Sequence, residues 1–190
     1  MKIENENYRI VNDEKINGKE ELVIINNFDF YLTTITIYAD GLIDCWGLVD
    51  FTTFKSMIQK GKVLVSLPPN SKLYINNIGE AQINSFNSLK SIDDFIKEVE
   101  DIIKELNREP GRETICITLF KEYLINNSET NLKRLQLAFK DLPSHKKRLF
   151  EELDNKDPLI LLMSQNLILS INERKNILWD YFDMNGIEIK

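Results

Sequence analysis

The string Asp44-Cys45-Trp46-Gly47 places a thiol between an acid and a large aromatic ring. A cysteine becomes a nucleophile when a nearby base or positive charge lowers its pKa. The one histidine, His145, lies far along the chain within a run of lysine and arginine, where a solvated surface position is the ordinary role. Cys45 also alternates with polar neighbours, as a core residue of a strand does. We therefore interpret Cys45 as a packing thiol and assign no catalytic residue.

Four acidic residues of the N-terminal half could act through their carboxylates. Converging carboxylates bind magnesium or transfer protons, which is the chemistry of many hydrolases and nucleases. Turns and strand ends also take acidic residues for solvation and helix capping. A magnesium-dependent hydrolase or nuclease is thus the alternative hypothesis, and it requires three of the four residues to converge. The four residues are Asp40, Asp44, Asp50 and Glu80.

The remaining motifs predict no cofactor and no metal. A single histidine and two distant cysteines do not provide the ligand set of a zinc site. The seven glycines stand singly, and no glycine-rich phosphate-binding loop occurs. Neither ATP nor a dinucleotide is implied.

The charge balance disfavours nucleic acid as a partner. The net charge is −6 and the pI about 5.0, so binding to a phosphate backbone gains little free energy from counterion release. A basic cluster at Lys140 and residues 145–148, with Lys133 and Arg134 nearby, is the one candidate nucleic-acid surface and forms a weaker third hypothesis. Acidic residues follow on the same predicted helix, and pairing along the helix accounts for much of the cluster. Acidity would suit a protein partner with a basic surface. Solubility alone is the ordinary reason for such a charge balance.

Cysteine usage and hydropathy predict a cytoplasmic protein without a membrane partner. Cys45 and Cys116 are isolated thiols in apolar surroundings, which is typical of a reducing compartment. The polar N-terminus lacks the apolar core of a secretion signal. The longest apolar run, Leu159–Met163, is too short to span a bilayer.

Two β-rich runs around Asp40-Gly41 give the strongest local structural signal. Residues 30–38 and 42–49 are dense in β-branched, aromatic and other apolar residues, and an Asp-Gly pair between such runs predicts a hairpin with a type I′ turn. Alternation along the arms predicts one buried face, formed by Ile35, Ile37, Ile43 and Cys45, opposite Thr34, Thr36, Asp44 and Trp46.

Further strands and one inserted helix complete the predicted β-rich half. Asp50 is placed to cap a helix over residues 51–60, closed by Gly61. We predict five or six antiparallel strands in total. Besides the hairpin, they cover residues 22–25, 62–66, 73–75 and 81–86.

The pattern changes to helical periodicity at Ser88. Ser91 and Asp94 form a predicted capping box, and the helix that follows carries one apolar face to Leu106. A Val99→Asp substitution on that face should unfold the helical half. The later elements are helices over 112–125, 129–140, 144–153 and 171–182, and a terminal strand over 187–189.

The sequence thus predicts an α+β fold, with an antiparallel β-rich half that carries one inserted helix and a helical half of four to five helices. The predicted domains are residues 1–88, antiparallel β-rich, and residues 89–190, helical. They could instead be two layers of one domain.

The hairpin region resembles an uncharacterised bacterial protein family. The similarity rests on Tyr38-Ala39-Asp40-Gly41, on Asp44-Cys45-Trp46-Gly47, on the Phe-bearing segment 51–55 and on Leu67-Pro68. It continues weakly through residues 98–108 and 142–153. The family has no assigned activity, so the resemblance supports the architecture and transfers no catalytic residue. Immunity proteins and small regulators are common among bacterial families of this size.

The leading hypothesis is a non-enzymatic binding or regulatory protein, in the manner of an immunity protein, that acts by protein–protein interaction. Its motivation is the acidic balance together with the aromatic hairpin. The predicted contact residues for a partner are Tyr38, Asp40, Asp44 and Trp46.

Overall fold

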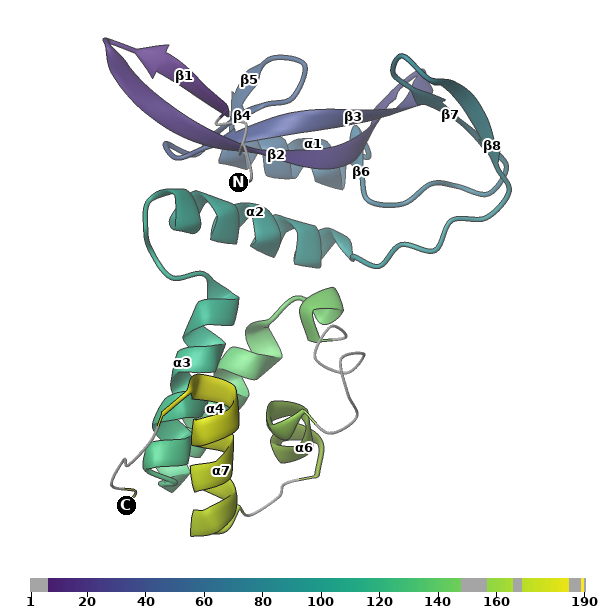
Figure 1. Cartoon of the computed structure of the whole chain (residues 1–190). Coiled ribbons are helices and arrows are strands. Elements are labelled where there is room, and N and C mark those ends of the chain that lie inside the picture. The colour runs from purple at the N-terminus through teal and green to yellow at the C-terminus, as the bar shows by residue number, and fades with distance from the viewer. Residues whose placement is uncertain (1–6, 148–156, 166–168, 185–188, 190) are drawn as a thin grey trace. The chain divides into compact units, whose positions relative to one another are not determined.

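The computed structural model describes residues 7–147, 157–165, 169–184 and 189 of the 190-residue chain. The chain divides into two compact units, Met1–Glu109 and Pro110–Lys190 (Figure 1). The first unit contains the strands and two helices, and the second is helical within its described residues. The α+β class predicted from the sequence is confirmed.

The first unit is built on one eight-stranded sheet. Its central path runs β1-β2-β3-β4-β5, while β6 pairs with β2 and the β7–β8 hairpin joins the sheet through β3. The pairings are antiparallel except for the parallel pair β3–β7. The strands are β1 Asn7–Val11, β2 Glu14–Asn27, β3 Asp29–Tyr38, β4 Leu42–Asp44, β5 Leu48–Asp50, β6 Val63–Leu64, β7 Ser71–Ile75 and β8 Gly79–Ile83.

The prediction of five or six antiparallel strands undercounted this sheet and missed its parallel pair. The β1–β2 hairpin was not expected as a paired unit, because each face near its turn mixes apolar and polar side chains, with Ile10 opposite Lys15 and Val11 opposite Glu14. Its two-residue turn, Asn12-Asp13, has positive φ values of 50° and 65°. Positive φ at both central residues is the requirement of a type I′ turn.

The predicted Asp40-Gly41 hairpin is present as the pair β3–β4, but its predicted turn type is wrong. Gly41 has a φ of 82°, whereas Asp40 is not among the residues with positive φ. The Gly41 N–H donates to the Tyr38 carbonyl at 2.9 Å, so a tight turn precedes the glycine. The connection is therefore a three-residue loop, in which glycine takes the left-handed position after the turn.

One face of the sheet packs against α1 (Phe51–Gln59) and α2 (Ile92–Leu106). Asp50 caps α1 as predicted, accepting from the Thr53 N–H at 2.7 Å, and Ser91 and Asp94 form the predicted capping box of α2. The predicted alternation is confirmed, because the apolar arm residues of the hairpin are buried here. The core consists of Val23, Ile25, Ile35, Ile37, Ile43, Cys45, Phe54, Ile58, Val63, Phe95, Val99 and Ile102.

The helix α2 belongs to the sheet unit. Val99, with 0% exposure, lies in the same core as the strand residues. The apolar face of α2 packs in this core. The compact unit accordingly extends to Glu109, whereas the sequence places the change of pattern at Ser88. We therefore expect Val99→Asp to damage the sheet unit first, in place of the helical half named from the sequence.

The second unit contains α3 (Arg112–Ile125), α4 (Glu129–Asp141), α6 (Pro158–Gln165) and α7 (Ile171–Phe182). Ser128 and Ser170 cap α4 and α7. The helix α6 was not predicted. The expected helix over 144–153 and strand over 187–189 lie partly outside the described residues. The core of this unit is formed by Cys116, Phe120, Tyr123, Leu124, Leu135, Leu142, Leu159, Leu162, Leu169 and Leu178.

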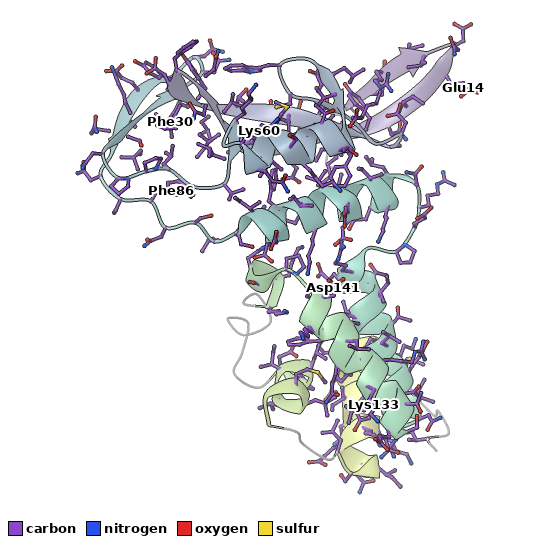
Figure 2. The ribbon with its side chains drawn as sticks, turned by 180° about the vertical axis from the view of Figure 1, so that it is seen from behind. Glu14, Phe30, Lys60, Phe86, Lys133 and Asp141 are labelled. Carbon is purple, nitrogen blue, oxygen red and sulfur yellow. The ribbon has the colours of Figure 1, made fainter. Side chains whose placement is uncertain are left out.

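The two ends of the sheet are marked by different side chains. Glu14 lies at the tip of the β1–β2 hairpin and Phe30 at the opposite end (Figure 2). Next to Phe30 along the chain comes Tyr31, from which the candidate site is built.

Candidate functional site

The string Asp44-Cys45-Trp46-Gly47 consists of the last residue of β4 and the tight three-residue loop that leads to β5. Asp44 pairs with Leu48 across this hairpin, and the Asp44 carboxylate accepts from the Gly47 N–H at 3.3 Å. Trp46 and Gly47 have positive φ values of 55° and 139°. A non-glycine residue in the left-handed region is uncommon, and such strain is held by the surrounding structure. The loop directs Cys45 into the core and leaves Trp46 56% exposed.

Trp46 is the first of three neighbouring aromatic rings from three separate strands or loops. The Trp46 and Tyr31 ring centroids are 5.5 Å apart, at an interplanar angle of 61°. Tyr31 in turn stacks on Tyr74, with centroids 5.4 Å apart and planes at 25°. The parallel register of β3 and β7 places Tyr31 directly beside Tyr74. We call these three residues the aromatic row.

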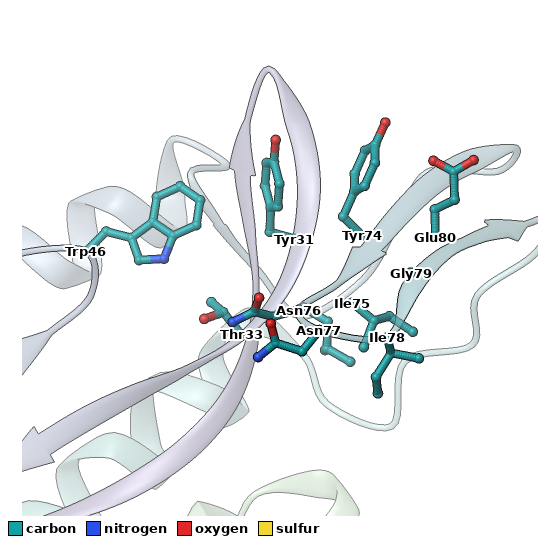
Figure 3. Close-up of a pocket in the computed structure, with 11 residues that line it drawn as sticks. Tyr31, Thr33, Trp46, Tyr74, Ile75, Asn76, Asn77, Ile78, Gly79 and Glu80 are labelled. Atoms are coloured by element: carbon teal, nitrogen blue, oxygen red, sulfur yellow. The ribbon is translucent and has the colours of Figure 1, made fainter.

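The aromatic row lines a groove of about 590 Å³. The other side of the groove is the β7–β8 turn, where the Ile78 N–H donates to the Ile75 carbonyl at 3.1 Å. Figure 3 shows the Tyr31 and Tyr74 hydroxyls and the Glu80 carboxylate pointing to one side, with Asn76 and Asn77 at the turn. The lining residues are Tyr31, Leu32, Thr33, Trp46, Tyr74, Ile75, Asn76, Asn77, Ile78, Gly79 and Glu80.

Glu80 is the charged residue among the described residues that line this groove, and none of them is cationic. Lys72, outside the lining, lies with its ammonium nitrogen 2.5 Å from the Glu80 carboxylate and 5.1 Å from the Tyr74 ring centroid. The hydrogen bond to Glu80 is the main reason that the pKa of Lys72 is raised. Tyr74 and Glu80 together thus already hold one cation.

Two of the predicted contact residues lie in a different part of the sheet. The Tyr38 side chain is buried, with 9% exposure, and the Arg9 guanidinium carbon lies 5.1 Å from its ring centroid. Arg9 also forms an ion pair with Asp40. Across the strand pair, Tyr38 lies opposite Gly18. These four residues form a local packing group away from the groove.

The structure therefore brings together only part of the predicted set. Trp46 lines the groove, and Asp44 holds the loop that presents it. The two tyrosines of the aromatic row were not predicted as site residues. No local sequence signal joins them, since their contact depends on the parallel pairing of β3 with β7.

The four carboxylates of the alternative hypothesis each serve a separate local contact. Asp40 pairs with Arg9, Asp44 accepts from the Gly47 N–H, and Glu80 pairs with Lys72. Asp50 caps α1, and the Thr53 backbone hydrogen bond lowers the pKa of its carboxyl. Across the described ranges, no group of three or more His, Cys, Asp or Glu side chains is placed to hold a metal ion. The magnesium-dependent hypothesis requires three of the four carboxylates to converge, and these residues do not form such a group.

The thiols of Cys45 and Cys116 are buried. Burial raises the pKa of each thiol to about 11, and the neighbouring carboxylate of Asp44 adds to the effect at Cys45. A thiol that stays protonated at neutral pH is a poor nucleophile. The interpretation of both residues as buried packing thiols is confirmed.

The fold and the site define an α+β domain whose largely antiparallel sheet carries two helices and an aromatic groove. The chain belongs to a family described as a domain of unknown function, DUF7638, whose model matches residues 6–110, more than half of the chain. The match ends close to Glu109, where the first compact unit ends. This match confirms the resemblance to an uncharacterised family. No curated protein and no solved structure matched the chain.

Among the described residues, no helix combines the length and the apolar character needed to cross a bilayer.

Proposed function

We propose that this chain is a non-enzymatic binding protein that regulates another protein by holding it in the groove beside the aromatic row. The observation that carries the proposal is the exposed Trp46 ring, presented by a strained loop next to Tyr31 and Tyr74. Tryptophan and tyrosine dominate binding energy at protein interfaces, because they offer a large rigid contact area at little cost in conformational entropy.

The polar lining of the groove supports the same proposal. Asn76, Asn77 and Thr33 offer amide and hydroxyl groups that donate and accept hydrogen bonds. Rigid aromatic residues combined with adaptable asparagine and threonine are the composition of a protein-recognition surface. The volume of about 590 Å³ accommodates a few side chains of a partner segment.

The partner in this proposal presents a basic surface. The chain carries a net charge of −6, and the groove itself carries Glu80. Opposite charge on the partner speeds the encounter and disfavours wrong partners. Asp44, exposed beside Trp46, adds to the negative potential.

The immunity-like form of this function is the specific version that we propose. A bacterial immunity protein neutralises one toxic protein by occupying its functional surface. The support is the analogy with small bacterial families of this size, together with the acidic charge. A gene for a basic toxic protein next to the gene for this chain, neutralised on co-expression, supports this version. A neighbouring toxin that the chain does not neutralise contradicts it.

A quantitative affinity purification from the native host tests the binding function. The bait proteins are the unchanged chain, Trp46→Ala, Tyr74→Ala and the control Trp179→Ala. Trp179 is also exposed, at 49%, but lies in the second unit. Truncating an aromatic hot spot costs about 2 kcal/mol or more, a loss of affinity of roughly thirtyfold.

The expected result is a protein retained by the unchanged chain and by Trp179→Ala but lost with Trp46→Ala and Tyr74→Ala. The same pattern must appear with the purified pair by calorimetry. Equal retention by all four baits, or no reconstituted binding, contradicts the proposal.

A further inference from the structure

We propose that the groove takes a proline-rich segment of the partner, in the polyproline II conformation, with a basic residue at one end. This inference rests on the proposed function and names the chemistry of the segment that is held. Its support comes from the ring arrangement, the hydrogen-bonding groups and the charge of the groove.

The aromatic row has a surface shape that fits such a segment. Polyproline II has three residues per turn and a regular alternation of ridges and gaps, and aromatic-lined grooves recognise it. Tyr31 and Tyr74 form a flat stack at 25°, whereas Trp46 is turned by 61° to Tyr31. The stack and the angled indole ring give two differently shaped contact surfaces for successive proline rings.

The polar groups of the groove suit a backbone without internal hydrogen bonds. In polyproline II the carbonyl groups are unpaired and proline has no N–H, so the segment needs donors from its receptor. The Tyr31 and Tyr74 hydroxyls point to one side of the groove, while the Asn76 and Asn77 amides lie at its turn (Figure 3). Hydroxyl and amide groups of these kinds donate to carbonyl oxygens.

The cation site for the basic residue is formed by Tyr74 and Glu80. Lys72 already occupies it, with its nitrogen 2.5 Å from Glu80 and 5.1 Å from the Tyr74 ring centroid. An arginine of the partner satisfies the same two groups, because its planar guanidinium stacks on an aromatic ring and pairs with a carboxylate. Lys72 is then an internal competitor that the arginine displaces.

Phosphate-bearing ligands fit this groove poorly. Single-stranded nucleic acid also stacks on exposed aromatic rings, but it requires positive charge along its backbone. No described lining residue is cationic, and the ammonium of Lys72 beside the groove is already paired with Glu80. The described lining therefore offers no cation to a phosphate backbone, which favours a basic peptide over a nucleic acid.

The test is an NMR titration of the full chain with synthetic peptides. The probe is Arg-Pro-Leu-Pro-Pro-Leu-Pro, and the controls replace its arginine by glutamate or its prolines by alanine. The indole N–H signals of Trp46 and Trp179 report on the groove and on the second unit. The expected result is a shift of Trp46 with the probe, a weaker effect with the glutamate peptide and none with the alanine peptide.

Two variants test the cation site. Glu80→Gln should weaken probe binding about two- to fivefold, the range of an exposed ion pair. Lys72→Ala should strengthen it by a similar factor because the competitor is gone. Glu14→Gln, at the far end of the sheet, removes one acid without affecting the groove and should leave binding unchanged (Figure 2). Weaker or unchanged binding by Lys72→Ala contradicts the displacement of Lys72.

No Trp46 shift with the probe, an equal shift with the alanine peptide, or a response to cellohexaose or oligouridylate alone overturns the inference. The proposed function fails separately. If Trp46→Ala abolishes partner binding while the probe causes no shift, the groove binds a protein through another kind of segment.

Discussion

Tyr31 stacks on Tyr74 across the parallel pair of strands, with ring centroids 5.4 Å apart. The same strand pair joins the β7–β8 hairpin to the central sheet, and the turn of this hairpin lines the groove together with Trp46. The aromatic row is therefore both a packing feature and the wall of the groove.

The stack should contribute measurably to the stability of the first unit. In a double-mutant cycle, we expect a coupling energy of about 0.5–1.5 kcal/mol between Tyr31→Ala and Tyr74→Ala, as found for aromatic pairs. Urea unfolding followed by circular dichroism measures it. Tyr8→Ala, at an exposed position of β1, combined with Tyr74→Ala provides the control and should be additive. A coupling energy near zero for the tyrosine pair contradicts the stacking.

Even the small change Gly18→Ala should destabilise the fold. A Cβ atom at this position would lie 2.8 Å from the Tyr38 ring and 2.9 Å from the Thr36 methyl carbon. Overpacking of this kind destabilises the folded chain by about 1–3 kcal/mol. Replacing glycine by alanine also stabilises by roughly 0.4–1 kcal/mol, because it lowers the conformational entropy of the unfolded chain, and this gain is smaller. We expect Gly18→Ala to lower the free energy of unfolding, with a smaller loss in a Tyr38→Ala background. Equal losses in both backgrounds contradict the ring contact.

The two buried thiols should make the protein less stable at alkaline pH. Each thiol has a pKa of about 11 in the folded chain against an ordinary value of 9.0. Their contribution to stability is thus fully present below pH 9.0 and is lost as the pH rises towards about 11. The urea midpoint should fall across this window, and less steeply in Cys45→Ala and Cys116→Ala. An unchanged slope in both variants contradicts the assignment.

Val99→Asp should unfold the first unit. The substitution places a carboxylate in a core with 0% exposure, and burial of an unpaired charge is among the most destabilising changes known. One tryptophan reports on each unit, Trp46 on the first and Trp179 on the second. We expect the Trp46 indole signal to move to its random-coil position. The matched change Leu89→Asp, at an exposed site, should leave it in place.

The sequence was sufficient for features that depend on neighbours along the chain. Asp50 and Ser91 cap their helices as predicted, and the alternation in the Asp40-Gly41 hairpin correctly separated buried from exposed side chains. Caps and alternation follow from local geometry, and such signals are readable in one sequence. The turn type was not readable, since Asn12-Asp13 rather than Asp40-Gly41 adopts the two positive φ values.

Features that depend on distant pairing were missed. Trp46 was predicted as a contact residue and lines the groove, but Tyr31 and Tyr74 meet through the parallel β3–β7 pair, for which the sequence carries no local signal. The apolar face of α2 was recognised, yet its packing partner was not, because periodicity states that a face is buried without stating against what. Tyr38 was expected at the contact surface, but its ring covers Gly18 from the neighbouring strand.

Site-specific photo-crosslinking in the native host tests the central claim most directly. A benzoylphenylalanine replaces Trp46 in one variant and Trp179 in a second, and the crosslinked proteins are identified by mass spectrometry. Our account predicts that one basic protein crosslinks through position 46, that Tyr74→Ala abolishes this product, and that position 179 does not give it. The same products from both positions, or none from position 46, would contradict a partner-binding groove beside the aromatic row.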